Sequence, residues 1–317
     1  FVEEKKIQAG YEKYPKKNWR DLIKHKKGVL ITDFADLKEF LIIQELKDGL
    51  PRIKFINKKN NKKTEIKFDE EAYQLNFNEG AEYASNLIRV NYSAMNVPAT
   101  VYQYNLKTEK RKKLKQQKIP AGFNKNKYET KRVFAKSHDG KKIPISILKL
   151  KTTKNNAPTL LYGYGSYGMS MAPSFSVARL SLVDRGMVFA IAHIRGGMEK
   201  GRQWYLDGKL RKKKNTFKDF IKSAKFLKNS KISGDLTIHG GSAGGLLIGS
   251  TINMAPKLFK SAVADVPFVD VLNTILDASL PLTPPEWEEW GNPILNKNDF
   301  LNIQSYSPYD NVRKQEY

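Results

Sequence analysis

The feature that most constrains this chain is the run Gly240-Gly241-Ser242-Ala243-Gly244-Gly245, which lies between two apolar segments. The segment before it, Asp235–His239, is typical of a short buried strand, and Leu246–Asn253 continues as a helix. A serine at the tip of so tight a turn needs glycine two positions before and two after it, because larger side chains would collide with the strand or the helix. The run therefore predicts a nucleophile elbow.

Such an elbow has a defined chemistry. It exposes the hydroxyl of Ser242, and it points the backbone N–H of Ala243 and the positive end of the helix at a developing oxyanion. Two other interpretations stay open from these residues alone, an ordinary glycine-rich turn and a phosphate-binding loop. The run lacks the Lys-Ser/Thr ending of a P-loop, which disfavours the second of them.

The sequence around this run predicts an α/β domain over residues 128–317. Apolar strand-like segments alternate with helical ones, and Asp139-Gly140 is a strong hairpin signal between the first two strands. Strand–helix alternation indicates a doubly wound, mostly parallel sheet. The expected strands are Tyr128–Lys136, Lys142–Lys149, Thr159–Tyr162, Met187–His193, Asp235–His239 and Phe259–Val266.

Residues 1–116 have a different, all-β pattern. Short apolar runs recur between turns rich in Asp, Gly, Asn and Lys, and they form two groups of four expected strands. Consecutive four-strand groups of about 45 residues are typical of β-propeller blades. Two blades cannot close a ring, so we expect 1–116 to be the C-terminal part of a propeller, 117–127 a linker, and 128–317 an incomplete hydrolase domain.

Composition excludes several classes of site. The chain has no cysteine and four histidines, so a thiol nucleophile, a disulfide scaffold and a cysteine zinc site are excluded, and no metal or organic cofactor is implied. The net charge of +24 raises the possibility of a nucleic-acid partner, but the lysines are scattered along the chain, which disfavours it. No apolar run approaches the ~20 residues that cross a bilayer, so we expect no membrane partner and a cytoplasmic location.

Several motifs together resemble the prolyl oligopeptidase family of serine peptidases, and in detail its oligopeptidase B branch. They occur in the family's order and spacing over nearly the whole chain. The resemblance implies a partial α/β-hydrolase domain preceded by the last blades of a propeller, which in this family excludes large substrates. The segments that carry it are Tyr162–Gly168, His193–Gly197, Lys213–Phe217, Gly240–Gly245, Glu286–Pro293 and Ser305–Val312.

The resemblance also implies roles for individual residues. Ser242 matches the acyl-accepting nucleophile, and Tyr164 matches a tyrosine that joins the N–H of Ala243 in the oxyanion hole. Glu286 and Glu288 match paired carboxylates that select Arg or Lys on the acyl side of the cleaved bond. We expect Glu289 to be a solvated surface residue. Arg195 and its two following glycines are expected to form a tight turn with a structural ion pair.

The catalytic base has no candidate in the sequence. The α/β-hydrolase order is serine, then acid, then histidine, and no histidine follows Ser242. We expect His239 to point into the sheet and His193 to be structural, while His25 and His138 lie in the blade region and a hairpin turn. The chain is therefore expected to be inactive alone. It is interpreted as a remnant of an eroded gene, as part of a longer chain, or as half of a split enzyme completed by a separate chain that carries the Asp and His.

Three functions remain open. The first is a serine endopeptidase that cleaves short basic peptides after Arg or Lys through an acyl-enzyme on Ser242. The second is an esterase or acyl-peptide hydrolase with the same elbow. The third, from another class, is a non-catalytic basic binding module, which would show salt-dependent binding to RNA or DNA.

Overall fold

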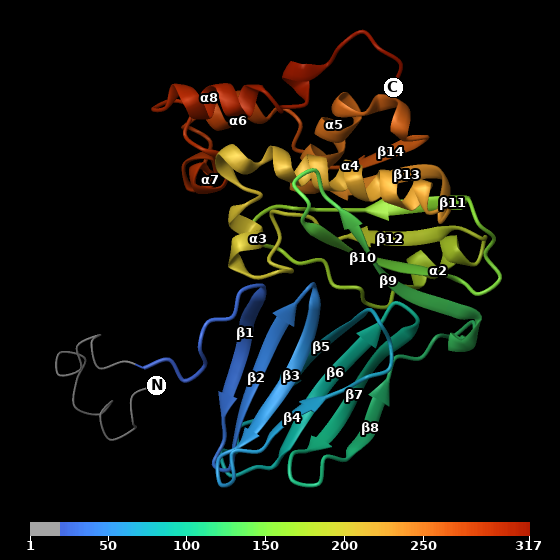
Figure 1. The fold of residues 1–317 in the computed structure, drawn as a ribbon, viewed down its shortest axis with the longest axis vertical. Coiled ribbons are helices and arrows are strands. Elements are labelled where there is room, and N and C mark those ends of the chain that lie inside the picture. Colours follow the sequence, from blue (N-terminus) through green and yellow to red (C-terminus); the bar gives the residue numbers. More distant parts are fainter. Residues whose placement is uncertain (1–19) are drawn as a thin grey trace, which may run out of the picture.

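The computed structural model describes residues 20–317. One end of the molecule consists of two four-stranded antiparallel sheets, and the other end consists of a six-stranded sheet covered by helices (Figure 1). The first part of the expected 1–116 domain, residues 1–19, lies outside the described residues. Between β8 and β9 the chain contains one short 3₁₀ turn, η3 (Lys125–Lys127).

In each four-stranded sheet the strands lie side by side in sequence order. Buried side chains of both sheets form a single core, in which the ring of Phe55 meets the ring of Tyr104 edge-on at 6.0 Å. The strands are β1 (Val29–Asp36), β2 (Phe40–Lys47), β3 (Leu50–Asn57) and β4 (Lys63–Ile66), then β5 (Tyr73–Asn78), β6 (Leu87–Ala94), β7 (Val97–Asn105) and β8 (Arg111–Gln116).

The six-stranded sheet has the order β14-β13-β11-β12-β10-β9. β9 and β10 form an antiparallel hairpin around Asp139-Gly140, and β10 is antiparallel to β12. β12, β11, β13 and β14 are mutually parallel, as the strand–helix alternation predicts. The strands are β9 (Tyr128–Lys136), β10 (Lys142–Leu150), β11 (Ala157–Tyr162), β12 (Val188–Ala192), β13 (Ser233–Gly241) and β14 (Ser261–Asp265).

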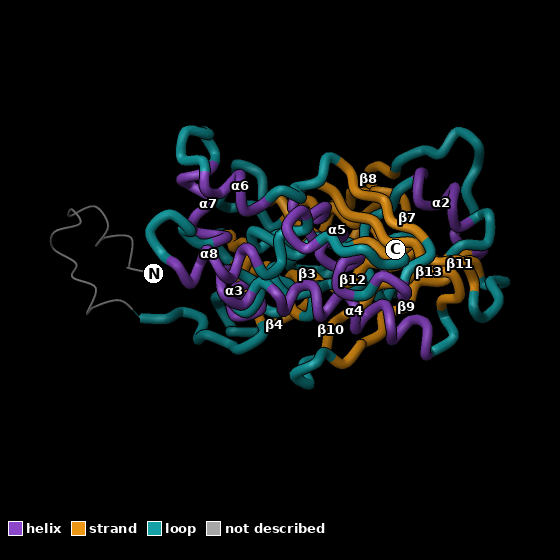
Figure 2. Tube along the Cα trace, turned by 90° about the horizontal axis from the view of Figure 1, so that it is seen from above, coloured by secondary structure: helices purple, strands orange, loops and turns teal. Residues whose placement is uncertain are grey.

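Helices cover both faces of this sheet. Residues of α4 and α5 pack in the core of one face, whereas α2 packs on the other, and Figure 2 shows α4 and α2 on opposite sides of the strands. Three shorter helices, α6 to α8, gather beside α4 (Figure 1). The helices are α2 (Val177–Val183), α3 (Arg202–Leu206), α4 (Lys214–Asn229), α5 (Ala243–Met254), α6 (Val271–Leu276), α7 (Thr283–Trp290) and α8 (Lys297–Gln304).

The chain order of the strands reverses at β11. From β11 the chain passes through α2 to β12 on one side, and it then crosses to β13 on the other side of β11. The loops that leave the carboxyl ends of β11 and β13 therefore run in opposite directions. In open α/β sheets this switch point is where ligands bind. Here the two strand ends are level, since Tyr162 of β11 pairs with His239 of β13.

The antiparallel sheets dock on the α/β part through backbone and side-chain bonds. The N–H of Gly49, in the turn between β2 and β3, donates to the carbonyl of Glu199 at 2.6 Å. The N–H of Phe175 donates to Ser93 Oγ at 2.9 Å. Met95, from the turn between β6 and β7, is buried in the cluster that also holds residues of α2. The two parts thus share a packed interface.

A buried ion network fixes the loop after β12. Arg195 is fully buried, and its Nε and Nη2 donate to the two carboxylate oxygens of Asp219 on α4 at 2.7 and 2.6 Å. Its Nη1 donates to Asp139 at 2.7 Å, and Nη2 also donates to Ser137 Oγ at 2.9 Å. The predicted structural ion pair of Arg195 is confirmed. It joins the β12 loop to α4 and to the β9–β10 hairpin.

We predict that Asp219→Asn destabilises the fold strongly. The substitution preserves shape but leaves the Arg195 guanidinium buried beside a neutral amide, and breaking a buried pair in this way costs about 3–5 kcal/mol. Urea unfolding, followed by circular dichroism, measures the change in the free energy of unfolding. Asp235→Asn, at an exposed position of β13, is the matched control. Equal unfolding midpoints for the two variants would contradict this account.

Candidate active site

Ser242 lies at the carboxyl end of β13 in a strained backbone conformation, with φ 55° and ψ −120°. Its N–H donates to the carbonyl of Asp265 at 2.9 Å, and its own carbonyl accepts from the N–H groups of Gly245 at 2.8 Å and Phe268 at 3.1 Å. Positive φ is costly for a serine, so these bonds from β14, α5 and the following loop hold the turn. Ser242 is an exposed residue.

Two of the glycines in the turn have no room for a side chain. A Cβ on Gly240 would lie 2.4 Å from the carbonyl oxygen of Gly244, and one on Gly245 would lie 2.4 Å from Cα of Pro267. Both neighbours are backbone atoms that cannot move aside. The small residues around Ser242 are thus required by the close approach of β13, α5 and the loop after β14.

Tyr164 and Ala243 flank the serine from the two strand ends. Ala243 opens α5, so its N–H has no partner in a preceding helical turn. Tyr164 follows β11, and its ring carbon Cδ2 would lie 3.2 Å from a Cβ on Gly244. Burial raises the pKa of the Tyr164 hydroxyl, and a hydrogen bond with Ser242 acts in the opposite direction. The phenol therefore remains protonated at neutral pH and can donate a hydrogen bond.

Glu286 places a carboxylate among aromatic rings near the same loop. The hydroxyl of Tyr167 donates to its two oxygens at 3.1 and 2.9 Å, and Trp290 Nε1 also donates to it. The Trp290 ring lies 5.6 Å from the ring of Tyr167 and 5.6 Å from that of Phe268. An anionic group with aromatic walls is the environment that a planar cation such as guanidinium prefers.

The structure does not bring Glu288 to this carboxylate. Residues two positions apart in α7 are about 200° apart around the helix axis, so Glu286 and Glu288 lie on different faces. Glu288 is exposed, and no hydrogen bond or ion pair involves it within the described residues. Their joint role in binding a basic side chain, which the family resemblance implies, stays a prediction.

The expectation for Glu289 was wrong. This residue is 4% exposed, and it accepts the N–H of Tyr167 at 3.0 Å and the hydroxyl of Tyr205 at 2.5 Å. It stands three positions after Glu286, which places both carboxylates on the same side of α7, toward the β11 loop. The motif Glu-Trp-Glu-Glu-Trp contains this spacing. However, the sequence alone does not show which of its glutamates are buried, because that depends on how the helix packs.

Lys213 belongs to the motif Lys213–Phe217, and the sequence predicted no role for it. It is 1% exposed, and its Nζ donates to the carbonyl of Gly165 at 2.7 Å and to Ser166 Oγ at 2.6 Å. The ammonium nitrogen lies 4.9 Å from the centre of the Trp290 ring. Burial lowers the pKa of Lys213 to about 7, against the opposing effect of Glu289.

All four histidines are among the described residues, and none is hydrogen-bonded to Ser242. His193 is fully buried beside Ser146 Oγ at 2.8 Å, and burial lowers its pKa. His239 was expected to point into the sheet, but its imidazole is partly exposed and lies 2.5 Å from Asp265. His138 contacts Ser137, and His25 is exposed.

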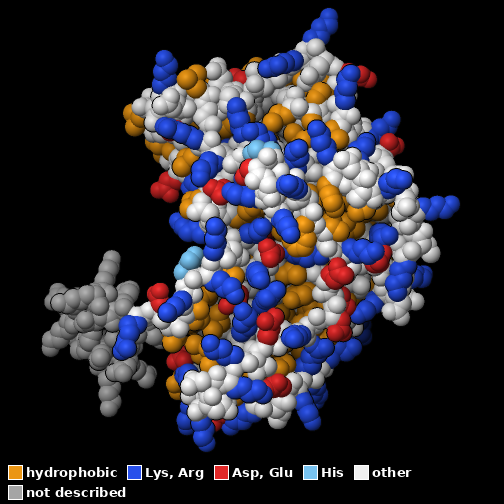
Figure 3. Space-filling model, viewed as in Figure 1, with side chains coloured by type: hydrophobic (Ala, Val, Ile, Leu, Met, Phe, Trp, Pro, Cys, Tyr) orange, Lys and Arg blue, Asp and Glu red, His pale blue; other side chains and the backbone are white. Residues whose placement is uncertain are grey.

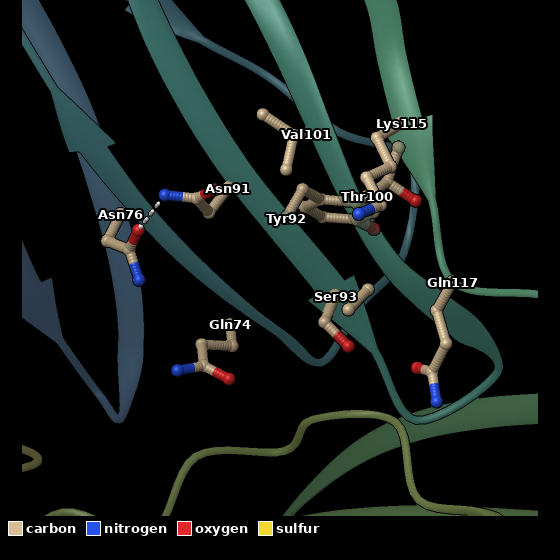
Figure 4. Close-up of a pocket in the computed structure, with 10 residues that line it drawn as sticks. Gln74, Asn76, Asn91, Tyr92, Ser93, Thr100, Val101, Lys115 and Gln117 are labelled. Atoms are coloured by element: carbon tan, nitrogen blue, oxygen red, sulfur yellow. Dashed lines mark hydrogen bonds between the residues drawn. The ribbon is translucent and has the colours of Figure 1, made fainter.

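The pocket in Figure 4 lies away from these residues, on the β5–β8 sheet. It has a volume of about 420 Å³, and amide side chains line much of it, with Asn91 donating to Asn76 at 2.8 Å. Its lining contains no paired base and nucleophile, so it offers no catalytic chemistry.

Surface charge and the metal-ligating side chains give no second site. On the face drawn in Figure 3, lysines and arginines are spread over both parts of the molecule with acidic residues between them. Within residues 20–317 no three His, Asp or Glu side chains are grouped so that they could hold a metal ion. No helix in that range combines the length and the apolarity needed to span a membrane.

Comparisons with known proteins match both parts of the chain. The family model for the prolyl oligopeptidase family matches residues 173–317, and the model for the N-terminal β-propeller domain of prolyl oligopeptidase matches residues 5–117.

Relatives and solved structures agree with these models. Dipeptidyl aminopeptidase BI of Pseudoxanthomonas mexicana is 43% identical, over 98% of this chain and 43% of that protein. Protease 2 of Moraxella lacunata is 36% identical, over 94% of this chain and 43% of that protein. The structure of oligopeptidase B from Leishmania major superposes with a TM-score of 0.85 at 41% identity, over 93% of this chain and 43% of that one.

This chain spans less than half the length of these relatives. Its six-stranded sheet with helices on both faces is part of an α/β-hydrolase domain, and the antiparallel sheets before it are propeller blades. The motifs, the fold and the comparisons point to one conclusion: the chain belongs to the prolyl oligopeptidase family of serine peptidases.

Proposed function

We propose that this chain carries the nucleophile, the oxyanion donors and the side-chain pocket of a serine endopeptidase that cleaves short peptides after Arg or Lys. One observation carries the proposal. The exposed hydroxyl of Ser242, at the tip of a strained turn, lies beside Tyr164, whose loop also contacts the carboxylate of Glu286 through Tyr167. Nucleophile, oxyanion donor and cation-binding group thus converge at the switch point of the sheet.

The chemistry follows from these positions. Ser242 Oγ attacks the carbonyl carbon of the scissile bond, and its proton passes to a general base. The negative charge that develops on the carbonyl oxygen accepts hydrogen bonds from the Ala243 N–H and the Tyr164 hydroxyl. The C–N bond then breaks, and the amine leaves with the proton. Water next attacks the acyl-enzyme, gives its proton to the base, and releases the acid product as Ser242 regains its proton.

Selectivity for a basic side chain rests on Glu286. Its carboxylate is half-buried between Tyr167 and Trp290, so a guanidinium placed there would exchange water for charge-assisted hydrogen bonds and ring contacts. A planar guanidinium can bond both carboxylate oxygens at once, which favours Arg over Lys.

The base is the missing group. No histidine of this sequence is bonded to Ser242, so we propose that a histidine and its acid come from a segment other than these 317 residues, such as a separate chain. A serine without its base retains only the rate enhancement of binding and the oxyanion hole. Because the chain contains no cysteine and the site needs no disulfide, a reducing compartment such as the cytoplasm suits it.

A second candidate is favoured by one relative. Dipeptidyl aminopeptidase BI is 43% identical to this chain, and its name indicates removal of dipeptides from a free N-terminus. The two functions differ in whether the substrate's amino group is recognised. Equal binding of N-acetylated and free arginyl peptides supports the endopeptidase, whereas a requirement for the free amine supports the dipeptidyl aminopeptidase.

We predict that Glu286→Gln weakens binding of agmatine, a guanidinium probe for the side-chain pocket, about ten- to a hundredfold. The reason is that a hydrogen bond to a charged partner contributes about 1.5–3 kcal/mol. Isothermal titration calorimetry measures the dissociation constant. Glu288→Gln, on the other face of α7, should change it less than about fivefold, because an exposed charge contributes at most about 1 kcal/mol. A larger effect of Glu288→Gln would reverse the assignment.

We also predict that the chain alone does not hydrolyse an arginyl amide at peptidase rates, because its serine lacks a base. Release of a chromogenic leaving group is the measurement, and the rate of the wild-type chain should equal that of Ser242→Ala. Turnover that is fast in the wild type and lost in Ser242→Ala would show that a base is present after all.

A further inference from the structure

Two buried residues, Lys213 and Glu289, form hydrogen bonds with the same loop from opposite sides. Neither takes part in the proposed attack of Ser242 on the substrate. The loop, residues 164–167, follows β11 and begins with Tyr164, the tyrosine of the oxyanion hole. Lys213 precedes α4, and Glu289 lies near the end of α7, so the loop is held between two elements that are far apart in the sequence.

Lys213 holds the carbonyl side of the loop. Its Nζ donates to the backbone oxygen of Gly165 and to Ser166 Oγ at 2.7 and 2.6 Å. Gly165 has φ 78°, and a Cβ there would lie 2.4 Å from Thr216 Cγ2, so the backbone passes directly against α4. A buried lysine is costly unless its amine is hydrogen-bonded, and both bonds go to this loop.

Glu289 holds the N–H side of the same loop. One of its oxygens accepts the backbone N–H of Tyr167 at 3.0 Å, and the other accepts the Tyr205 hydroxyl at 2.5 Å. The carboxylate is 4% exposed. Within three residues, therefore, the loop donates to a buried acid and accepts from a buried amine. This arrangement leaves it little freedom to rotate.

We propose that Lys213 and Glu289 are positioning residues, which fix the loop so that the Tyr164 hydroxyl stays beside Ser242. The inference rests on the proposed function, because it is the oxyanion role of Tyr164 that gives this placement its value. Glu289 also shares a side of α7 with Glu286, so the helix that would bind the substrate's guanidinium is bonded to the loop that would bind its carbonyl oxygen.

The charge on Lys213 changes near neutral pH. Burial lowers its pKa to about 7, while the negative charge of Glu289 raises it. The other ionisable groups that interact with Glu289 are Tyr164, Tyr167, Tyr205 and Tyr306. Lys209 Nζ lies 3.0 Å from the Tyr205 hydroxyl, and Asp299 interacts with Tyr306. Protonation of Lys213 below this pKa strengthens its bonds to Gly165 and Ser166, because a charged donor bonds more strongly than a neutral one.

The first test follows the loop directly. The backbone amide signals of Gly165 and Tyr167 are recorded by ¹H–¹⁵N NMR between pH 5.5 and 9. We expect a titration step near pH 7 that Lys213→Met abolishes and that Glu289→Gln moves to lower pH, because the opposing charge is gone. Lys222→Met, at an exposed position of α4, is the matched control and should retain the step. A step that persists in Lys213→Met overturns the proposal.

The second test separates the oxyanion hole from the side-chain pocket. An arginine aldehyde binds by adding Ser242 Oγ to its carbonyl carbon: the C–O π bond breaks, and the serine proton ends on the new hydroxyl, whose oxygen lies in the oxyanion hole. Agmatine tests the pocket alone. Lys213→Met should weaken the aldehyde about tenfold or more and agmatine less than about twofold, since misplaced oxyanion donors affect only the former.

The outcomes distinguish the two proposals. Equal weakening of both ligands would make Lys213 a merely structural residue and overturn the inference. If the wild type binds neither ligand, the proposed function fails, and the NMR titration still decides the role of Lys213. If Lys213→Met does not fold, Glu289→Gln serves in the same two measurements, and an unchanged aldehyde affinity in that variant overturns the inference.

Discussion

The parallel pairing of β11 with β13 is the constraint on which the rest of this structure depends. Because Tyr162 pairs with His239, the loop that carries Tyr164 and the turn that carries Ser242 leave the sheet at the same level. The turn can then close only if its residues are small, and it is held by bonds from Asp265, Gly245 and Phe268. Side chains from two strand ends thus meet without any contact that is local in sequence.

The helices add the second layer of the site. α7 lies against the β11 loop, and two of its acidic side chains, three positions apart, form hydrogen bonds with Tyr167 of that loop. Glu286 is half-buried among aromatic rings and available to a cation, whereas Glu289 is buried and bonded to the backbone of Tyr167. Lys213, which precedes α4, donates hydrogen bonds to Gly165 and Ser166 of the same loop. The buried hydrogen bonds of these groups explain how a loop that contains Gly165 is held in one position.

Much of the framework could be predicted from the sequence. The strands on both sides of Asp139-Gly140 and the strand–turn–helix around Ser242 appear within a few residues of their expected bounds, and two groups of four strands are present before residue 117, as expected. They are set by local patterns, namely alternation, glycine placement and turn residues. The helices α2, α3, α6, α7 and α8 were not predicted. They are short, and their formation depends on packing against the sheet and on one another rather than on a strong periodicity of their own.

The sequence by itself determined the chemical inventory of this protein: one serine in a strained turn, a tyrosine loop, a cluster of glutamates, no cysteine, and no histidine after Ser242. Only the tertiary structure decided how that inventory is divided. It separated Glu288 from Glu286, buried Glu289, and turned Lys213, one lysine among many, into the buried partner of Gly165 and Ser166. The physical reason is that burial and hydrogen-bond partners come from elements distant in the chain, whereas residue type and spacing express only what is local.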